Sequence, residues 1–552
     1  MQTDACNGDG SAPTGGAPSH ASVHRVLPWV LLALAVGAHA LYLYAWFERD
    51  HSVARSVGNS LVAGVATALC AVEQGQWSLL SDVGRQGLMA PAAALARPFL
   101  GGDPDLLYRV VALCLIGTQV ALFDLGRQLA GPLAGVLAAA LFPLLPDVGS
   151  AVRAWWPLMP QVLLLCIAAG LLLRSRGFSR PGFAAAFAAL GGLGIYVSSY
   201  PMHNLCYLAP IGAMALGAGI SGVVFGRDPV SLERVSRSRG LVGGLLALAL
   251  LGMALWLGGL PESSLAYADS QLQDPQFSQA AAPGSLAALT AYLRLGFSGS
   301  LTPLLAVPFL AALPLWLRGG RGWPVLMCWF VLPLVVFSLI AKKNVYYLGQ
   351  ILPVVPLVIA LGLASLRRRW MAGPAAALVL VLAALQYAAL FPLGDPHQTL
   401  PPWVRVLNLH ALPADAQQVF EEPKLVGLEP LPRATVHERA ARLVLDAERE
   451  GFSQGGSVAL DPAVAYLVAL EEPCGALDAH PAPLSHADLE RLLFQRVERV
   501  VVVEPHCGPQ AADGADRLTR SPSLERFYEV VAKDLRAVPC VHLYRLRDWL
   551  GR

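Results

Sequence analysis

The sequence is poor in charge and almost without lysine. Only 14% of its 552 residues are charged, whereas 55% are hydrophobic, and the mean hydropathy is +0.52. Lysine occurs only at positions 342, 343, 424 and 533. Soluble globular domains carry about 25% charged residues. The scarcity of charge therefore excludes an ordinary soluble protein and predicts an α-helical polytopic membrane protein.

Several signatures of known chemistry are also missing. The chain has no Walker A sequence, no G-x-S-x-G elbow and no H-E-x-x-H pair, so ATP-driven transport, serine hydrolysis and zinc proteolysis lose their usual support. It lacks the basic, aromatic-interleaved patches of nucleic-acid-binding proteins, so no nucleic acid is expected as a partner. Its nine cysteines lack metal-ligand spacing. No metal or other cofactor is indicated, although a divalent cation is left open.

The cysteines fall into two groups. Five lie in apolar segments, where the side chain usually behaves as a small hydrophobe: Cys70, Cys114, Cys166, Cys206 and Cys328. Three lie in the polar C-terminal part: Cys474, Cys507 and Cys540. A disulfide among these three is an option if that part is extracytoplasmic, but the spacing does not determine a pairing.

Apolar runs bounded by charge or by Pro and Gly recur along the first 390 residues. About eleven membrane spans are expected, at 27–47, 107–124, 129–146, 157–174, 182–199, 203–225, 240–260, 300–317, 323–341, 345–366 and 371–391. The chain is accordingly divided into a disordered leader at 1–24, a transmembrane domain at 25–391 and a small soluble α/β domain at 392–552. In the last domain, strands are expected at 457–461, 499–504 and 541–546.

Clusters of arginine predict the orientation. They fall on alternate connections, which the positive-inside rule assigns to the cytoplasm: Arg25, Arg127, Arg174 to Arg180, Arg227 to Arg239, Arg318 with Arg321, and Arg367 to Arg369. The N-terminus is then inside, and the α/β domain lies outside a bacterial cytoplasmic membrane. Four connections face outward: 48–106, the turn 147–156, the loop 261–299 and the Lys pair at 342–343. A helix at the membrane interface is expected at 59–72, and 261–299 has the form of a mobile flap.

The first candidate site follows the first span, where WFERDHS places Glu48, Asp50 and His51 within four positions. An acid at the outer mouth of a span could take a proton from an attacking hydroxyl or amine. Charges directly after a span are also ordinary interfacial caps. Both interpretations stand at this stage.

The second candidate is KKNVYYLGQ, which contains Lys342, Lys343, Tyr346 and Tyr347. The positive-inside rule disfavours lysine on an outer turn, so a compensating anion is expected. The phosphate of a lipid head group would serve, since an ammonium is a good point charge for it. Two lysines that merely extend to water are the alternative.

The third candidate is LLPDVGSAVRAWWP, with Asp147, Arg153, Trp155 and Trp156. Tryptophan at this depth is usually a membrane-belt residue. Aromatic faces beside an arginine also suit a sugar ring beside a phosphate. Other polar side chains are expected on the same outer face: Asp82, Arg85 and His203.

In this arrangement the sequence resembles the GT-C superfamily of membrane glycosyltransferases, and in particular the branch of protein O-mannosyltransferases and aminoarabinose transferases. The motifs are ERD at 48–50, GGDPDLLYRVV at 101–111, Arg153 followed by Pro160-Gln161, and KKNVYYLGQILPVVP at 342–356. In that family an acid after the first span is the catalytic base. The sequence departs from the family at Gln161, where an acid is expected, and at Arg49, which splits the acidic pair.

The resemblance implies inverting transfer of a sugar from a polyprenyl-phosphate donor to an acceptor glycan, lipid or protein at the outer face, among membrane lipids. Asp50, or else Glu48, would take the acceptor's proton. Lys342, Lys343 and Arg153 would stabilise the departing phosphate. Two other functions remain: a multispan transporter or lipid flippase, and a non-catalytic scaffold for envelope assembly. A transporter would be expected to have repeated halves and polar breaks at mid-membrane, whereas polarity here gathers at the outer ends.

Overall fold

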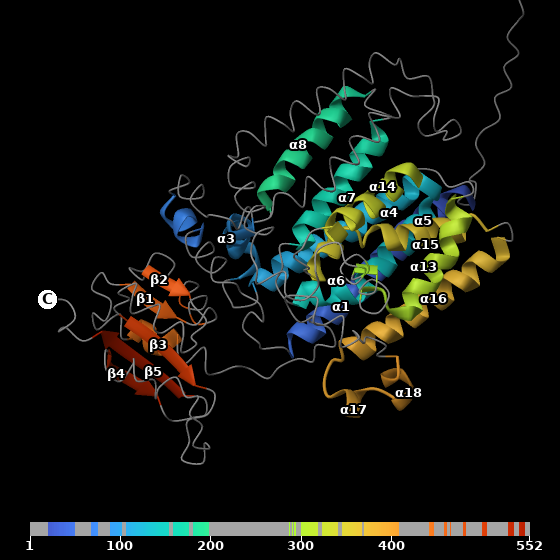
Figure 1. Ribbon diagram of the computed structural model, residues 1–552. Helices are drawn as coiled ribbons and strands as arrows, with labels where there is room; N and C mark the ends of the chain where they lie inside the picture. The colour runs from blue at the N-terminus through green and yellow to red at the C-terminus, as the bar shows by residue number, and fades with distance from the viewer. Residues whose placement is uncertain are drawn as a thin grey trace, which may run out of the picture.

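The computed structural model describes the following parts of the chain: residues 20–49, 68–75, 89–101, 106–153, 158–175, 180–197, 286, 290, 292–293, 300–317, 323–339, 345–366, 369–407, 441–446, 457–460, 464, 468, 478–481, 499–504, 528–534 and 540–546. Figure 1 shows helices packed into one body, with the strands grouped beside it.

The helical body is built from long apolar helices and short connecting ones. The helices are α1 (His20–Phe47), α3 (Met89–Leu100), α4 (Leu106–Ala130), α5 (Pro132–Leu141), α6 (Pro146–Arg153), α7 (Leu158–Arg174), α8 (Pro181–Val197), α13 (Thr302–Leu317), α14 (Trp323–Leu339), α15 (Val354–Ala364), α16 (Arg369–Leu390), α17 (Pro396–Thr399) and α18 (Pro402–Arg405). Two 3₁₀ segments accompany them, η3 (Phe142–Leu144) and η5 (Val345–Gln350). Residues 68–74 are also helical.

Nine of the expected spans coincide with described helices, and those at 203–225 and 240–260 lie outside the described residues. Among the described helices, α1, α4 and α16 are long and apolar enough to cross a membrane. The pair formed by α5 with η3 and α6 would be a fourth. Five further apolar helices are shorter. The total of about eleven spans therefore stays a prediction.

Two expected spans are interrupted rather than continuous. The run 129–146 ends in η3, and the chain then bends by 60° into α6. The expected turn at 147–156 is thus wrong in its first part, because residues 146–153 form a helix. Pro143 and Pro146 are the physical reason, since proline cannot donate a helical hydrogen bond. The run 345–366 likewise begins as 3₁₀ helix and becomes α-helix only at Val354.

Aromatic contacts show that α1 and α4 run antiparallel. The rings of Phe47 and Tyr108 lie 5.4 Å apart, and those of Trp29 and Phe123 lie 4.7 Å apart. The C-terminal end of α1 therefore meets the N-terminal end of α4, and we call this side of the molecule the Glu48 end. On the opposite side, Asp124 of α4 accepts hydrogen bonds from Arg127 (2.9 Å) and Arg174 (2.5 Å).

Glycines allow the closest helix crossing. Gly126 of α4 and Gly135 of α5 face each other, so that a Cβ on Gly126 would lie 2.7 Å from the Cα of Gly135. A Cβ on Gly135 would clash with the backbone carbonyl oxygen of Phe123 in α4 and would lie 3.1 Å from the amide nitrogen of Arg127. Small residues at such crossings let backbones approach, which is how helices gain packing energy inside a membrane.

The C-terminal strands form a mixed five-stranded sheet with the order β2-β1-β3-β5-β4. The strands are β1 (Ser457–Leu460), β2 (Asp478–Pro481), β3 (Arg499–Glu504), β4 (Tyr528–Asp534) and β5 (Cys540–Leu546). β1 pairs in parallel with β2 and β3, whereas β5 is antiparallel to β3 and β4. The three strands expected from the sequence are present. The continuous valine run of β3 fits its central place in the sheet.

Candidate functional site

Several chain segments meet at the Glu48 end. Glu48 and Arg49 follow α1 and are exposed. The Nη1 of Arg49 donates to the carbonyl oxygen of Leu393, just after α16. The hydroxyl of Tyr42 donates to the carbonyl oxygen of Phe391 at 2.8 Å. The C-terminal ends of α1 and α16 therefore lie together. The acidic cluster at 48–50 begins where α1 ends.

The described parts of the first loop lie at the same end. Arg109, near the start of α4, donates to the carbonyl oxygen of Leu100 at the end of α3. Arg97 of α3 forms an ion pair of 2.7 Å with Glu73 of the helix at 68–74. This helix overlaps the one expected at 59–72, and its Ala68, Leu69 and Ala71 are buried in the protein core.

Cys70 corrects a prediction made from the sequence. Its apolar surroundings suggested a small hydrophobe, but Cys70 is disulfide-bonded. Cys114, Cys166 and Cys328 carry thiols. Sequence spacing gave no signal for this bond.

Arg153, at the end of α6, is fully buried in an aromatic cage. Its Cζ lies 4.6 Å from the ring centre of Trp46, 5.2 Å from that of Tyr387 and 4.2 Å from that of Phe391. Its Nη1 donates to the carbonyl oxygen of Gly149 at 2.9 Å and to the hydroxyl of Tyr387 at 3.0 Å. Its Nε and Nη2 have no hydrogen-bond partner among the described residues. The cage thus joins α1, α6 and α16 around one cation.

Gln161 pairs with Gln350 in the body of the protein. The Nε2 of Gln350, in η5, donates to the Oε1 of Gln161 near the start of α7, and both side chains are buried. The indole of Trp329 donates to the backbone carbonyl of Gln350 at 3.1 Å. An amide therefore stands where the sequence comparison expected an acid, and a second amide meets it. This contact places η5, which begins two residues after Lys343, against the start of α7.

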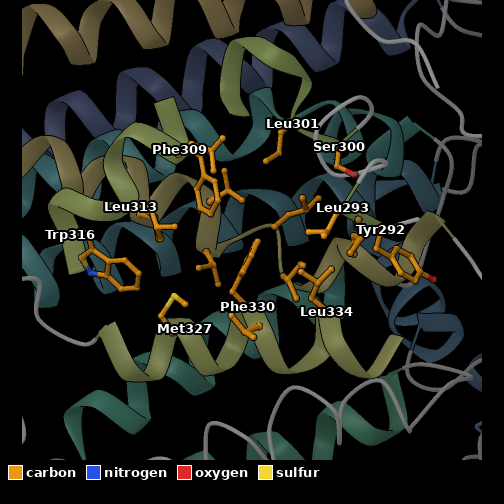
Figure 2. A pocket seen from close by; sticks show the side chains of 18 residues that line it. Tyr292, Leu293, Ser300, Leu301, Phe309, Leu313, Trp316, Met327, Phe330 and Leu334 are labelled. Atoms are coloured by element: carbon orange, nitrogen blue, oxygen red, sulfur yellow. The ribbon is translucent and has the colours of Figure 1, made fainter. Parts of the chain in front are cut away.

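An apolar cavity of about 240 Å³ lies between α13, α14, η5 and α15. Its walls include Leu313 and Trp316 of α13, Met327 and Phe330 of α14, and Leu348 of η5. Figure 2 shows the side chains of Phe309 and Phe330 pointing into it, and their ring centres are 5.5 Å apart. Tyr292 and Leu293, from the expected flap at 261–299, also line it. The lining suits a hydrocarbon chain rather than a sugar.

Many of the predicted site residues fall outside the described residues: Asp50, His51, Asp82, Arg85, Trp155, Trp156, His203, Lys342 and Lys343. Tyr346 and Tyr347 belong to η5, but their side chains are not among those described. Asp147 lies in the first turn of α6 and is half-buried. Among the described residues, no group of three or more His, Cys, Asp or Glu side chains could hold a metal ion.

The sequence-based analysis missed the residues that surround Arg153. His39, Trp46, Tyr387 and Phe391 were counted as parts of apolar spans. The signal that could have drawn attention to this region is His39, because an ionisable residue inside a span is rare and usually has a partner. Its Nε2 lies 3.1 Å from the hydroxyl oxygen of Tyr387. The partner itself was 348 positions away.

The architecture defines a multispan integral membrane protein with a fold that resembles the GT-C glycosyltransferases. The crystal structure of ArnT from Cupriavidus metallidurans, bound to undecaprenyl phosphate, superposes with a TM-score of 0.54 at 15% identity, over 95% of this chain and 98% of that one.

Two further solved structures are similar. The archaeal oligosaccharyltransferase AglB from Archaeoglobus fulgidus, in complex with an inhibitory peptide and a dolichol-phosphate, has a TM-score of 0.48 at 12% identity, over 87% of this chain and 69% of that one. The arabinofuranosyltransferase AftD from Mycobacteria has a TM-score of 0.49 at 16% identity, over 95% of this chain and 40% of that one. Neither a protein-family model nor a curated protein matches the sequence.

Proposed function

We propose that the protein is a membrane glycosyltransferase that moves a sugar from a polyprenyl-phosphate donor to an acceptor glycan, lipid or protein. The observation that carries the proposal is the apolar cavity, because η5 forms part of its wall. Leu348 of η5 lines the cavity, and the same short segment follows Lys342 and Lys343 in the chain. A segment that lines the apolar cavity is thus preceded in the sequence by two lysines. A phosphorylated lipid requires this combination, because its hydrocarbon chain needs apolar contacts and its phosphate needs cations.

The fold supports the same class of donor. ArnT, which shares the fold, was solved with undecaprenyl phosphate bound. In such a donor the sugar is already activated by the phosphate, so no nucleotide site is needed. The protein has to stabilise the phosphate that leaves and to accept one proton from the acceptor.

We assign the proton transfer to Asp50, with Glu48 as the neighbouring acid. Lys342, Lys343, Tyr346 and Tyr347 are assigned to the donor phosphate. Arg153 was predicted to join them, but in this structure it would reach a phosphate only after Trp46 or Phe391 moved aside, since these rings cover its guanidinium. The sugar and acceptor are assigned to the remaining polar set on that face: His51, Asp82, Arg85, Asp147, Trp155, Trp156 and His203.

We further propose that the Glu48 end and the C-terminal α/β domain are extracytoplasmic, in the cytoplasmic membrane of a bacterium. Arginine distribution supports this orientation. The disulfide at Cys70 supports it as well, because disulfides persist in oxidising compartments and are rare in the cytosol.

The disulfide gives a direct test of this orientation. Protein extracted in denaturant without reductant is expected to bind fewer maleimide groups than reduced protein, by at least two per chain. Cys70→Ser should add one reactive thiol to the unreduced protein, because the partner is released. Peptide mapping of that new thiol identifies the partner. If Cys70 itself reacts with maleimide in unreduced protein, the assignment is wrong.

The donor hypothesis is tested by narrowing the cavity. With purified protein in lipid nanodiscs and a panel of radiolabelled polyprenyl-phosphate hexoses and pentoses, wild type is expected to release label to an acceptor or to water. Leu313→Trp places an indole in the cavity and should raise the KM for donor about tenfold or more, because the lipid chain loses its apolar contacts. The kcat should change little, since the reacting groups are elsewhere.

A matched control is Leu378→Trp on α16, where the side chain is 60% exposed and lies outside the cavity. It should keep the wild-type KM. Equal KM values for all three proteins would contradict the cavity as the donor site. If no donor in the panel is consumed by wild type, the glycosyltransferase proposal itself fails.

One observation favours the transporter or flippase as a second candidate. The 60° bend between α5 and α6 breaks a span, and broken helices often line transport sites. The same nanodisc assay separates the two, since a flippase would carry a lipid-linked sugar across the membrane without cleaving the sugar from its phosphate. A scaffold would do neither.

A further inference from the structure

The aromatic cage around Arg153 is part of a longer buried chain of polar groups. His39 of α1, Tyr387 of α16 and Arg153 of α6 are 7%, 3% and 0% exposed. The hydroxyl of Tyr387 lies 3.0 Å from Nη1 of Arg153 and 3.1 Å from Nε2 of His39. One phenol therefore links a guanidinium and an imidazole that belong to two other helices.

The direction of these hydrogen bonds follows from their chemistry. A guanidinium can only donate, so the oxygen of Tyr387 accepts from Arg153. Its own proton is then available for Nε2 of His39, which accepts when the imidazole carries its proton on Nδ1. In this arrangement the hydroxyl of Tyr387 both accepts and donates a hydrogen bond. It also joins α1 to α16 through a buried side-chain contact.

The aromatic rings around Arg153 hold the same three helices, α1, α6 and α16, together near the acidic cluster. Trp46 is fully buried, stacks on the guanidinium at 4.6 Å and stands two residues before Glu48. On α6, Gly149 lets α16 approach, since a Cβ there would lie 2.7 Å from the Cζ of Phe391. A desolvated cation held by several aromatic rings is a strong and directional contact. Arg153 therefore contacts the last turn of α1 through the ring of Trp46.

We propose that Arg153, Tyr387 and His39 form a positioning network that fixes the last turn of α1, from which the acidic cluster at 48–50 follows, and that proton transfer from the acceptor depends on this. The inference rests on the proposed function and adds residues to it. None of the three touches substrate in this assignment. They act through Trp46 and the last turn of α1, where a misplacement of about 1 Å can cost about a hundredfold in rate.

The first test is Tyr387→Phe, which keeps the ring that faces the guanidinium and removes only the hydroxyl. In the nanodisc transfer assay, kcat is expected to fall about tenfold to a hundredfold, whereas the KM for donor stays within twofold. The dissociation constant for undecaprenyl phosphate alone, used as a probe without a sugar, should be unchanged. A merely structural role would lower the melting temperature and the active fraction without this split between kcat and KM.

The matched control is Tyr42→Phe. It removes a hydroxyl that also joins α1 to the end of α16, but this hydroxyl is not part of the hydrogen-bonded network of Arg153, Tyr387 and His39. Its kcat should stay within twofold of wild type. Arg153→Lys keeps the charge and loses the planar stack, so it should lose kcat and still bind undecaprenyl phosphate normally. If this variant binds the probe more weakly, Arg153 is a phosphate ligand and the positioning role is overturned.

A readout that needs no turnover keeps this inference separate from the proposed function. A nitroxide at Glu48→Cys reports the mobility of the end of α1, with the signal of the parent protein subtracted. Tyr387→Phe is expected to increase that mobility, and Tyr42→Phe is not. Unchanged mobility in Tyr387→Phe would overturn the network. Absence of transfer by wild type with every donor would overturn the glycosyltransferase proposal alone.

Discussion

Asp50→Asn is expected to lower the rate of sugar transfer by about a hundredfold to ten-thousandfold, which is the usual contribution of a general base. The amide has the shape of the carboxylate but cannot take a proton from the acceptor hydroxyl or amine. Binding of the donor should persist, because the phosphate is assigned to the Lys342 segment. The measurement is the initial rate of label transfer in nanodiscs, with the dissociation constant for undecaprenyl phosphate measured in parallel.

Glu48→Gln is the comparison that decides between the two acids. Glu48 is exposed at the end of α1 and is expected to act as a neighbouring charge, so its amide variant should lose less than about tenfold. If the losses are reversed, Glu48 is the base. If Asp50→Asn transfers sugar at the wild-type rate, neither the cluster after the first span nor its likeness to the glycosyltransferase motif describes the chemistry.

Gly135→Ala is expected to have the largest effect on stability. Its new methyl group would clash with the backbone of α4, at the carbonyl oxygen of Phe123 and near the amide nitrogen of Arg127. A backbone in a helix cannot turn aside as a side chain can, so α5 must move away from α4. Overpacking of this kind costs about 1–3 kcal/mol or more. A lower melting temperature, measured by loss of the monodisperse peak after heating in detergent, would show it.

The control is Gly37→Ala in α1, where an added Cβ meets nothing within 4 Å. Alanine there should be neutral or stabilise the helix by about 0.5–1 kcal/mol, because glycine is a poorer helix former. An equal loss of stability in both variants would mean that the loss comes from replacing a helix glycine as such. It would then not come from the crowding that the structure shows at Gly135. A Gly135→Ala protein as stable as wild type would contradict the close crossing of α4 and α5.

The positions of the helices could be predicted because the signal is local. A run of about twenty apolar residues has few alternatives to a helix in hydrocarbon, where each backbone N–H and C=O must be paired within the segment. The runs at 27–47, 107–124 and 371–391 lie within or close to α1, α4 and α16. The break before α6 also has a local signal, since Pro143 and Pro146 stand in the sequence, but the apolar composition of 129–146 favours one continuous span.

The site was only partly accessible to the same reasoning. Sequence could mark Arg153 as an unusual cation and Asp50 as a candidate base after the first span. The sequence alone also determines which side chains can accept a proton or bind a phosphate, because side-chain type does not depend on the fold. Tertiary structure alone decided that Arg153 is wrapped by Trp46, Tyr387 and Phe391. Those contacts join residues more than a hundred positions apart, and long-range packing leaves no period or spacing in a single sequence from which it could be read.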